Sequence, residues 1–236
     1  MTKKMLKILA FFLVGMAGGA LANQILWPYF AEKYAINNYG SEGSGFVIEK
    51  REMVVQENEA LTSAIEKASK AVVLIRSRNA SSTLMEGSGL VVTSDGLIVT
   101  LAELVPQGSE FAFYMDNKSV SYQVLKRDLI RNLALVKIGA SNLATVGFAS
   151  DSLKLGERVF AIGEFLENKA FSQVVDEGII RKISSSSAET DISGGKGLLG
   201  SPLFNIKSEA VGINFINGEE RIESIPISII KEFAGL

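Results

Sequence analysis

The sequence predicts an all-β domain, either a closed barrel or a sandwich, with few helices. Short segments rich in β-branched and aromatic residues recur from about residue 70 onward. Turn signals separate them, among them Ser94-Asp95-Gly96 and Asn217-Gly218. Helical periodicity is confined to the two ends of this region. The predicted strands lie in AVVLIRS, GSGLVVT, GLIVT, FAFYM, VSYQVL, LALVKI, RVFAIG, VVDEGIIRKI, SPLFNI and AVGINFI.

The N-terminus carries a membrane signal. Three lysines within the first seven residues precede an uncharged, mostly apolar run over residues 8–31. A helical span needs about 20 apolar residues, and lysines before it place the N-terminus in the cytoplasm. The alternative is a signal peptide cleaved after Ala22, because Ala20-Leu21-Ala22 is an A-x-A site. We favour a retained single-pass anchor over 1–31, because the apolar run continues past Ala22; both interpretations place the remaining chain outside the cytoplasm.

A tether and one folded domain follow the anchor. Residues 32–57 are polar, glycine-bearing and weakly periodic, which is typical of a tether. Residues 58–236 are then the domain. Its opening helix is predicted from apolar residues at helical spacing, namely Leu61, Ala64, Ile65 and Ala68. The segment ISIIKEF near the end predicts a closing helix.

Composition excludes several chemistries. The 24 basic and 26 acidic residues nearly cancel, so no charge pattern favours nucleic-acid binding. The chain has no cysteine, which removes disulfides and thiolate sites, and no histidine, the usual base near neutral pH. No metal site or cofactor is expected. Any hydrolytic mechanism must work without Ser-His or Cys-His chemistry.

Three segments together resemble the trypsin-like serine proteases of the HtrA (Deg) type. They are EGSGLVVTSDGLIVTLAELV (86–105), DLIRNLALVKI (128–138) and TDISGGKGLLGSPLFN (190–205). The resemblance implies two six-stranded antiparallel barrels, over about 70–138 and 145–233, with a cleft between them. It also implies a possible homotrimer, and it leaves no segment at the C-terminus for the PDZ domain that such proteins often carry.

The resemblance places substitutions at all three triad positions. Glu103 stands where the family has its histidine, Asn132 where it has the aspartate, and Leu199 where it has the nucleophilic serine. Serine attack needs a hydroxyl, a base and a group that orients the base. We therefore expect no catalytic residue here. At most, the N–H groups of Gly197 and Leu199 retain an oxyanion hole.

Two rival catalytic arrangements are weaker. Ser201 and Lys196 could form a dyad, but we favour Ser201 as a small residue at a close-packed strand start. Glu103 and Asp128 could form a carboxylate pair, but we favour a structural role for Asp128.

The predicted function is therefore binding by a pseudoprotease outside the cytoplasm, held at the membrane. Its partner is an extended or unfolded peptide, or an active protease relative, which it would regulate. The alternatives are a serine endopeptidase with a non-standard site and a purely structural envelope protein. Leu198 and Leu199 of the loop before SPLFNI either fill the vacant specificity pocket, which we favour, or are exposed for a partner. The strand at 213–215 is expected to offer an unpaired edge to an extended peptide. The candidate binding residues are Gly197, Leu198, Leu199, Ile213, Asn214 and Phe215.

Overall fold

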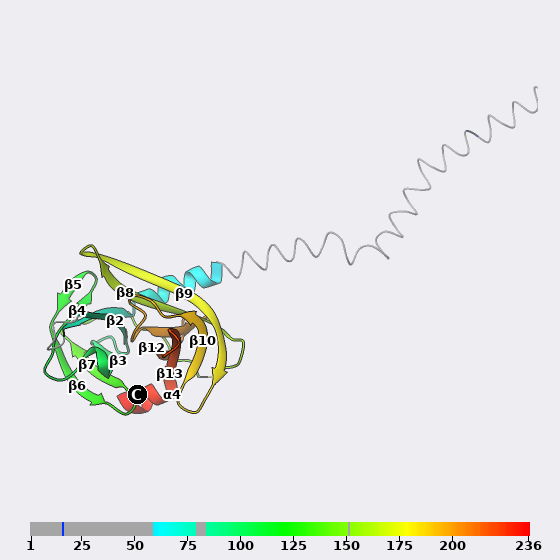
Figure 1. Ribbon diagram of the computed structural model, residues 1–236. Helices are drawn as coiled ribbons and strands as arrows, with labels where there is room; N and C mark the ends of the chain where they lie inside the picture. The colour runs from blue at the N-terminus through cyan, green and yellow to red at the C-terminus, as the bar shows by residue number, and fades with distance from the viewer. Residues whose placement is uncertain (1–15, 17–58, 79–83, 151) are drawn as a thin grey trace, which may run out of the picture. The chain divides into compact units, whose positions relative to one another are not determined.

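The computed structural model describes Met16 and residues 59–78, 84–150 and 152–236 (Figure 1). The predicted tether, and the predicted anchor apart from Met16, lie outside the described residues. Among the residues that are described, no helix is both long enough and apolar enough to cross a bilayer. Glu59–Leu236 form one compact unit.

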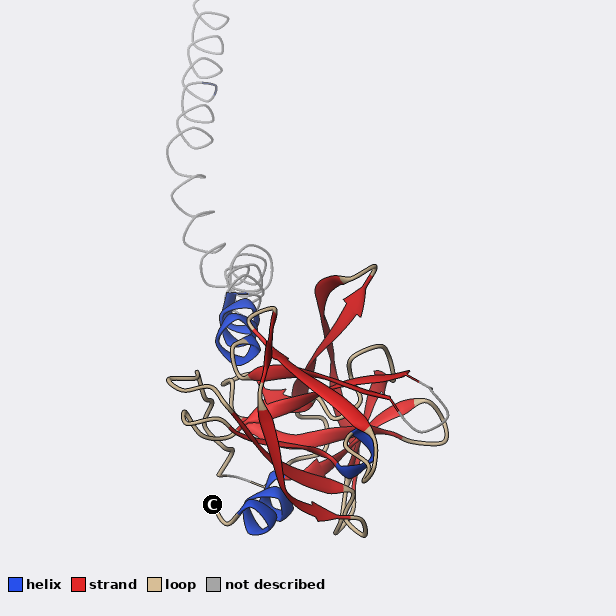
Figure 2. Cartoon of the chain, turned by 90° about the vertical axis from the view of Figure 1, so that its left-hand side faces the viewer, coloured by secondary structure: helices blue, strands red, loops and turns tan. Residues whose placement is uncertain are grey.

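Strands dominate this unit (Figure 2), with a helix over residues 59–69 and a second at its end. The elements are β1 Val72–Arg78, β2 Leu84–Val91, β3 Leu97–Leu101, the 3-10 helix η2 Ala102–Leu104, β4 Glu110–Met115, β5 Lys118–Val120, β6 Tyr122–Asp128, β7 Leu133–Ile138, β8 Arg158–Glu167, β9 Ala170–Ile183, β10 Ala188–Ser193, β11 Pro202–Asn205, β12 Ala210–Ile216, β13 Arg221–Pro226 and α4 Ile227–Ala234.

The second half of the unit is a closed barrel of six strands, in the order β10-β13-β12-β11-β8-β9. Its interior holds a small apolar cluster to which Leu198 contributes from the loop before β11. Strands β10 and β13 turn charged and polar residues outward, whereas their inner face buries apolar residues together with Thr190 and Ser224, so exposure alternates along AETDIS. The barrel confirms the predicted architecture of this half.

The first half is a seven-stranded antiparallel sheet, in the order β5-β4-β1-β2-β3-β7-β6. It differs from the predicted closed barrel of six strands. The hairpin after β4 turns at Asp116 and Asn117, both with positive φ, and returns as a strand of only three residues, β5. Over the described residues β5 does not pair with β6, although the Tyr122 ring packs against Phe113 at 5.0 Å between centroids.

The two halves share one apolar core. The larger buried cluster contains residues of the first sheet together with Phe160, Phe204 and Ile213 from the barrel. The predicted helices cover this core: Ala64 and Ala68 of the first helix are buried in it, as are Ile230 and Phe233 of α4. Because protein cores are close-packed, the junction holds the loops from both halves in fixed positions.

Candidate functional site

Glu103 and Asn132, at two of the positions that the resemblance assigns to the catalytic triad, lie side by side. The amide of Asn132 donates from Nδ2 to Oε1 of Glu103 at 2.7 Å, and the Glu103 N–H donates to Oδ1 of Asn132 at 3.1 Å. The Ala102 N–H also donates to the Asn132 carbonyl at 3.1 Å. Glu103 comes from η2 after β3, and Asn132 from the turn before β7, so pairing of β3 with β7 brings them together.

The turn before β7 sets the backbone conformation of Asn132. Its φ of 54° is in the left-handed region, which asparagine tolerates better than most residues. The Asp128 carboxylate accepts hydrogen bonds from the Ile130 and Arg131 N–H groups, at 3.0 and 2.9 Å. Asp128 therefore stabilises its own turn, the structural role favoured from the sequence.

The loop of residues 194–201 carries Leu199, at the position that the resemblance assigns to the nucleophile. Leu198 is 1% exposed and packs inside the barrel, whereas Leu199 is half-buried and contacts the shared core. Leu198 is therefore not exposed for a partner, whereas filling of the specificity pocket by these leucines stays a prediction. Gly197 and Gly200 have φ values of 77° and 72°, which only glycine adopts without strain.

Backbone contacts hold this loop against both halves. The Leu199 carbonyl accepts from the Ser88 N–H at 2.8 Å, and a Cβ on Gly87 would lie 2.4 Å from that carbonyl oxygen. On the barrel side, a Cβ on Gly163 would lie 2.4 Å from the Gly197 carbonyl oxygen. Close approach of three backbone segments therefore requires glycine at both places.

Ser88 is the central residue of this contact, and the sequence did not identify it. Its buried hydroxyl donates to the Gly197 carbonyl at 2.9 Å and accepts from the Glu164 N–H at 2.8 Å. Its carbonyl accepts from Oγ1 of Thr100 at 2.8 Å. The available signal was a serine between two glycines in GSGLVVT, which we assigned only to a predicted strand.

The N–H groups of Gly197 and Leu199 make no hydrogen bond with any residue in the described part of the chain. Both groups come from the loop that would form an oxyanion hole. The oxyanion hole itself stays a prediction.

The geometry does not support the Ser201–Lys196 dyad. Ser201 is fully buried; its hydroxyl donates to the Leu198 carbonyl at 2.8 Å and accepts from Nδ2 of Asn214 at 2.9 Å. Lys196 points to solvent, where its Nζ lies 4.0 Å from Glu167 Oε1. A general base must reach the proton it removes, and this lysine contacts another partner.

The predicted unpaired edge at 213–215 is wrong for its first two residues. Ile213 pairs with Pro202 on one side and Ile225 on the other. The Asn214 N–H donates to the Ser201 carbonyl and its own carbonyl accepts from the Gly200 N–H, both at 2.8 Å. From Phe215 onward, the side of β12 that faces the loop of residues 194–201 has no backbone partner among the described residues.

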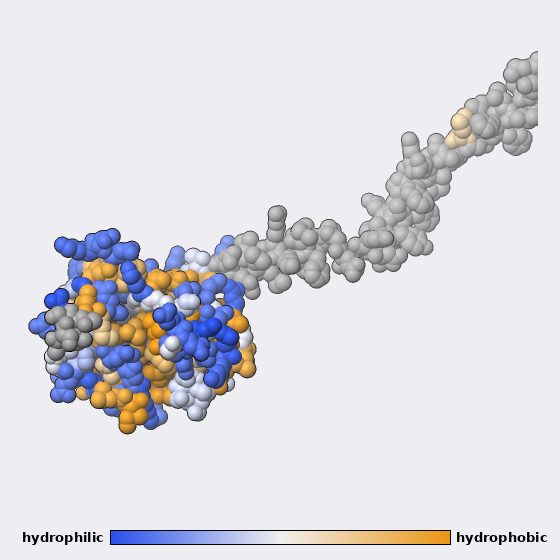
Figure 3. All heavy atoms as spheres, in the orientation of Figure 1, coloured by the Kyte–Doolittle hydropathy of each residue, from blue (hydrophilic) through white to orange (hydrophobic). Residues whose placement is uncertain are grey.

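A hollow of about 440 Å³ lies beside this free edge. Asn132, Phe215 and Ile225 line it, together with Ile130 from the turn after β6. That turn is unusually apolar at the surface: Leu129 is 80% and Ile130 98% exposed. Apolar groups also reach the surface elsewhere on the face in Figure 3. The hollow joins position 132 to the Phe215 edge.

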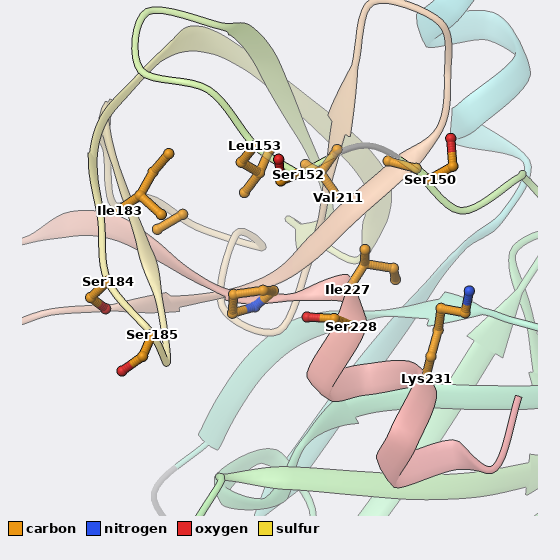
Figure 4. A pocket seen from close by; sticks show the side chains of 13 residues that line it. Ser150, Ser152, Leu153, Ile183, Ser184, Ser185, Val211, Ile227, Ser228 and Lys231 are labelled. Carbon is orange, nitrogen blue, oxygen red and sulfur yellow. The ribbon is translucent and has the colours of Figure 1, made fainter.

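A second cavity, of about 540 Å³, lies elsewhere (Figure 4). Serines 184 and 185 from the loop after β9, and Ser228 and Lys231 of α4, surround an apolar floor. It shares no lining residue with the hollow at Asn132. Within the described ranges, no group of three or more acidic side chains could hold a metal ion.

Comparisons with known proteins agree with this geometry. Residues 87–213 match the family described as trypsin-like peptidase domain. A DegP-like periplasmic serine endoprotease of Ectopseudomonas mendocina (strain ymp) is 34% identical over 138 residues, 54% of this chain and 28% of the relative. Serine protease HhoB of Synechocystis sp. is 34% identical over 142 residues, 54% of this chain and 33% of the relative.

A solved structure shows the same architecture. The serine endoprotease from Yersinia pestis superposes with a TM-score of 0.65 at 26% identity, covering 73% of this chain and 64% of that one. The matched region thus spans about a third or less of the curated relatives.

Proposed function

The chain belongs to the trypsin-like peptidase family, with relatives of the DegP/HtrA type, and from this premise we propose that it is an inactive member that acts by binding. The proposed ligands are extended or unfolded peptides, or an active protease relative that it regulates. One observation supports the proposal: Glu103 and Asn132, at two of the positions that the resemblance assigns to the triad, form a hydrogen-bonded pair, and the third such position holds Leu199.

The chemistry of that pair argues against hydrolysis. The Asn132 amide donates to Glu103 and carries no charge, so it cannot stabilise a protonated base. Leu199 has no lone pair with which to attack a carbonyl carbon. Losing one triad member already reduces turnover by several orders of magnitude. The nearest hydroxyl, that of Ser201, is committed to buried hydrogen bonds.

Peptide binding uses the parts that remain. Beyond Asn214 one side of the main chain has no strand partner among the described residues, and unpaired N–H and C=O groups are a template for an extended segment. The adjoining hollow is lined by Phe215, Ile225 and Ile130, which suit an apolar side chain of that segment. Leu199 does not line this hollow, and we propose that it adds apolar area where the resemblance places the family's nucleophile.

The location is also proposed. The basic start and the apolar run over residues 8–31 support a single-pass anchor with a cytoplasmic N-terminus. The name of the Ectopseudomonas relative places that protein in the periplasm, which fits a domain outside the cytoplasm. A homotrimer is proposed from the family resemblance alone.

Residual endopeptidase activity is the second candidate function. The N–H groups of Gly197 and Leu199, which bond no residue in the described part of the chain, favour it, because they would stabilise an oxyanion.

Labelling and binding experiments test these proposals. Residues 45–236 should leave casein intact, should not react with a fluorophosphonate, and should bind selected extended sequences on a peptide array. Labelling that Ser201→Ala abolishes would establish an enzyme. A folded domain that neither reacts nor binds any peptide would favour a structural envelope protein.

A further inference from the structure

The cavity of about 540 Å³ lies at one end of the closed barrel (Figure 4). The last residue of β9, the first of β10, the second of β12 and the last of β13 all line it, so four strand ends meet there. The segment before β8 and the start of α4 complete its wall. Mouths of β-barrels are common binding places for small molecules, whose sites usually measure about 300–1,000 Å³.

The floor of this cavity is aliphatic. Ala188, Val211 and Ile227 are at most 8% exposed there, whereas Ile183 on the wall is 42% exposed. An apolar ligand that covered Ile183 would remove this side chain from water, which is favourable. The described lining residues include no aromatic side chain on which a ring could stack. The lining therefore favours an alkyl chain over an aromatic ligand.

Lys231 is the one charged side chain among the described lining residues. It lies four positions after Ile227, on the same face of α4. In Figure 4 both side chains extend from α4 in the same direction, toward the loop that carries Ser150. The ammonium group makes no hydrogen bond or ion pair with a described residue. The adjacent acid, Glu232, instead pairs with Arg131 at 3.0 Å. The charge at the cavity is therefore positive and available to an anion.

A hydroxyl group accompanies this lysine. Ser228, in the first turn of α4, is exposed and its hydroxyl bonds no described residue, whereas the Ser184 hydroxyl donates to the Ser187 carbonyl at 3.0 Å. Residues 150 and 152 also reach the rim, but the residue between them lies outside the described ones. The polar contacts assigned to a ligand are therefore those of Ser228 and Lys231.

We propose that this cavity binds the anion of an aliphatic carboxylic acid. The alkyl chain packs on the aliphatic floor, and the carboxylate accepts charge-assisted hydrogen bonds from Lys231 and a hydroxyl hydrogen bond from Ser228. This site does not rest on the proposed peptide binding, because it shares no lining residue with the hollow at Asn132.

Calorimetric titration with three eight-carbon probes tests the ligand class. Octanoate, octan-1-ol and octylammonium share the alkyl chain and differ in the charge of the head group. Residues 45–236 are used, because they contain the compact unit of Glu59–Leu236 with the whole barrel. Octanoate should bind at a single site, at least tenfold more tightly than octan-1-ol, since a hydrogen bond to a charged group is worth this factor. Octylammonium should bind most weakly.

Equal or tighter binding of the alcohol or the amine would overturn the proposal, as would the absence of saturable octanoate binding.

Substitutions locate the site. Lys231→Gln should weaken octanoate binding about tenfold and leave octan-1-ol binding unchanged. Ser228→Asp should abolish octanoate binding by charge repulsion, and it should still fold, because an aspartate in the first turn suits the helix dipole. Lys118→Gln is the matched control, because Lys118 is exposed on β5 of the other sheet, and it should bind octanoate like the parent. Unchanged octanoate affinity in both Lys231→Gln and Ser228→Asp would show that octanoate binds elsewhere and would overturn the proposal.

Discussion

Replacing Ser88 by alanine tests the central contact of the site. The change removes one hydroxyl that bonds the Gly197 carbonyl at 2.9 Å and the Glu164 N–H at 2.8 Å, in a position with no solvent access. Alanine is smaller than serine and creates no clash. The effect on stability therefore comes from two buried partners that lose their hydrogen bonds.

The expected magnitude follows from those two partners. Leaving a buried donor or acceptor unsatisfied costs about 1–3 kcal/mol, so the pair should lower the free energy of unfolding by roughly 2–6 kcal/mol. With a urea m-value of about 2 kcal/mol/M, the midpoint should fall by about 1–3 M. This is a large part of the roughly 5–15 kcal/mol that stabilises a typical domain.

Urea unfolding followed by far-UV circular dichroism measures the shift. Ser119→Ala is the matched control, because Ser119 is exposed on β5 and its hydroxyl makes no hydrogen bond with the described residues. The control should unfold at the parent's midpoint. If Ser88→Ala also does so, the hydroxyl does not connect the loop to both halves, and our account of the site is wrong.

Three further predictions concern function and location. Replacing Glu103 by histidine, Asn132 by aspartate and Leu199 by serine together should leave a folded domain that a fluorophosphonate labels at position 199; an unfolded or unlabelled triple variant would contradict a retained scaffold. Leu199→Asp should weaken binding of an array-selected peptide at least tenfold, since burying a leucine contributes about 1.5–3 kcal/mol. The control Leu155→Asp, at a site that is 68% exposed, should bind the peptide as tightly as the parent does. Equal binding by the two variants would exclude Leu199 from the binding surface. Carbonate-washed membranes should retain the full-length chain, whereas a soluble chain starting at Asn23 would establish the cleaved signal peptide.

Local patterns in the sequence were sufficient to predict much of the fold. The all-β, trypsin-like architecture, confirmed here, follows from short strands and ordered motifs that need no knowledge of distant contacts. The helix at 59–69 and α4 were predicted because apolar residues at helical spacing depend only on neighbours. Strands β10 and β13 were missed because their outward residues are polar or charged, and only barrel closure shows which face is inside.

The residues at the three positions that the resemblance assigns to the triad, Glu103, Asn132 and Leu199, can be read from the sequence alone, and the loss of triad chemistry stays a prediction. What surrounds them was decided by tertiary contacts. Ser88 bonds residues 76 and 109 positions away, and Leu198 packs inside the barrel although Leu199 beside it is only half-buried. Burial and charge environment are properties of the packed neighbours, and a linear pattern does not specify those neighbours.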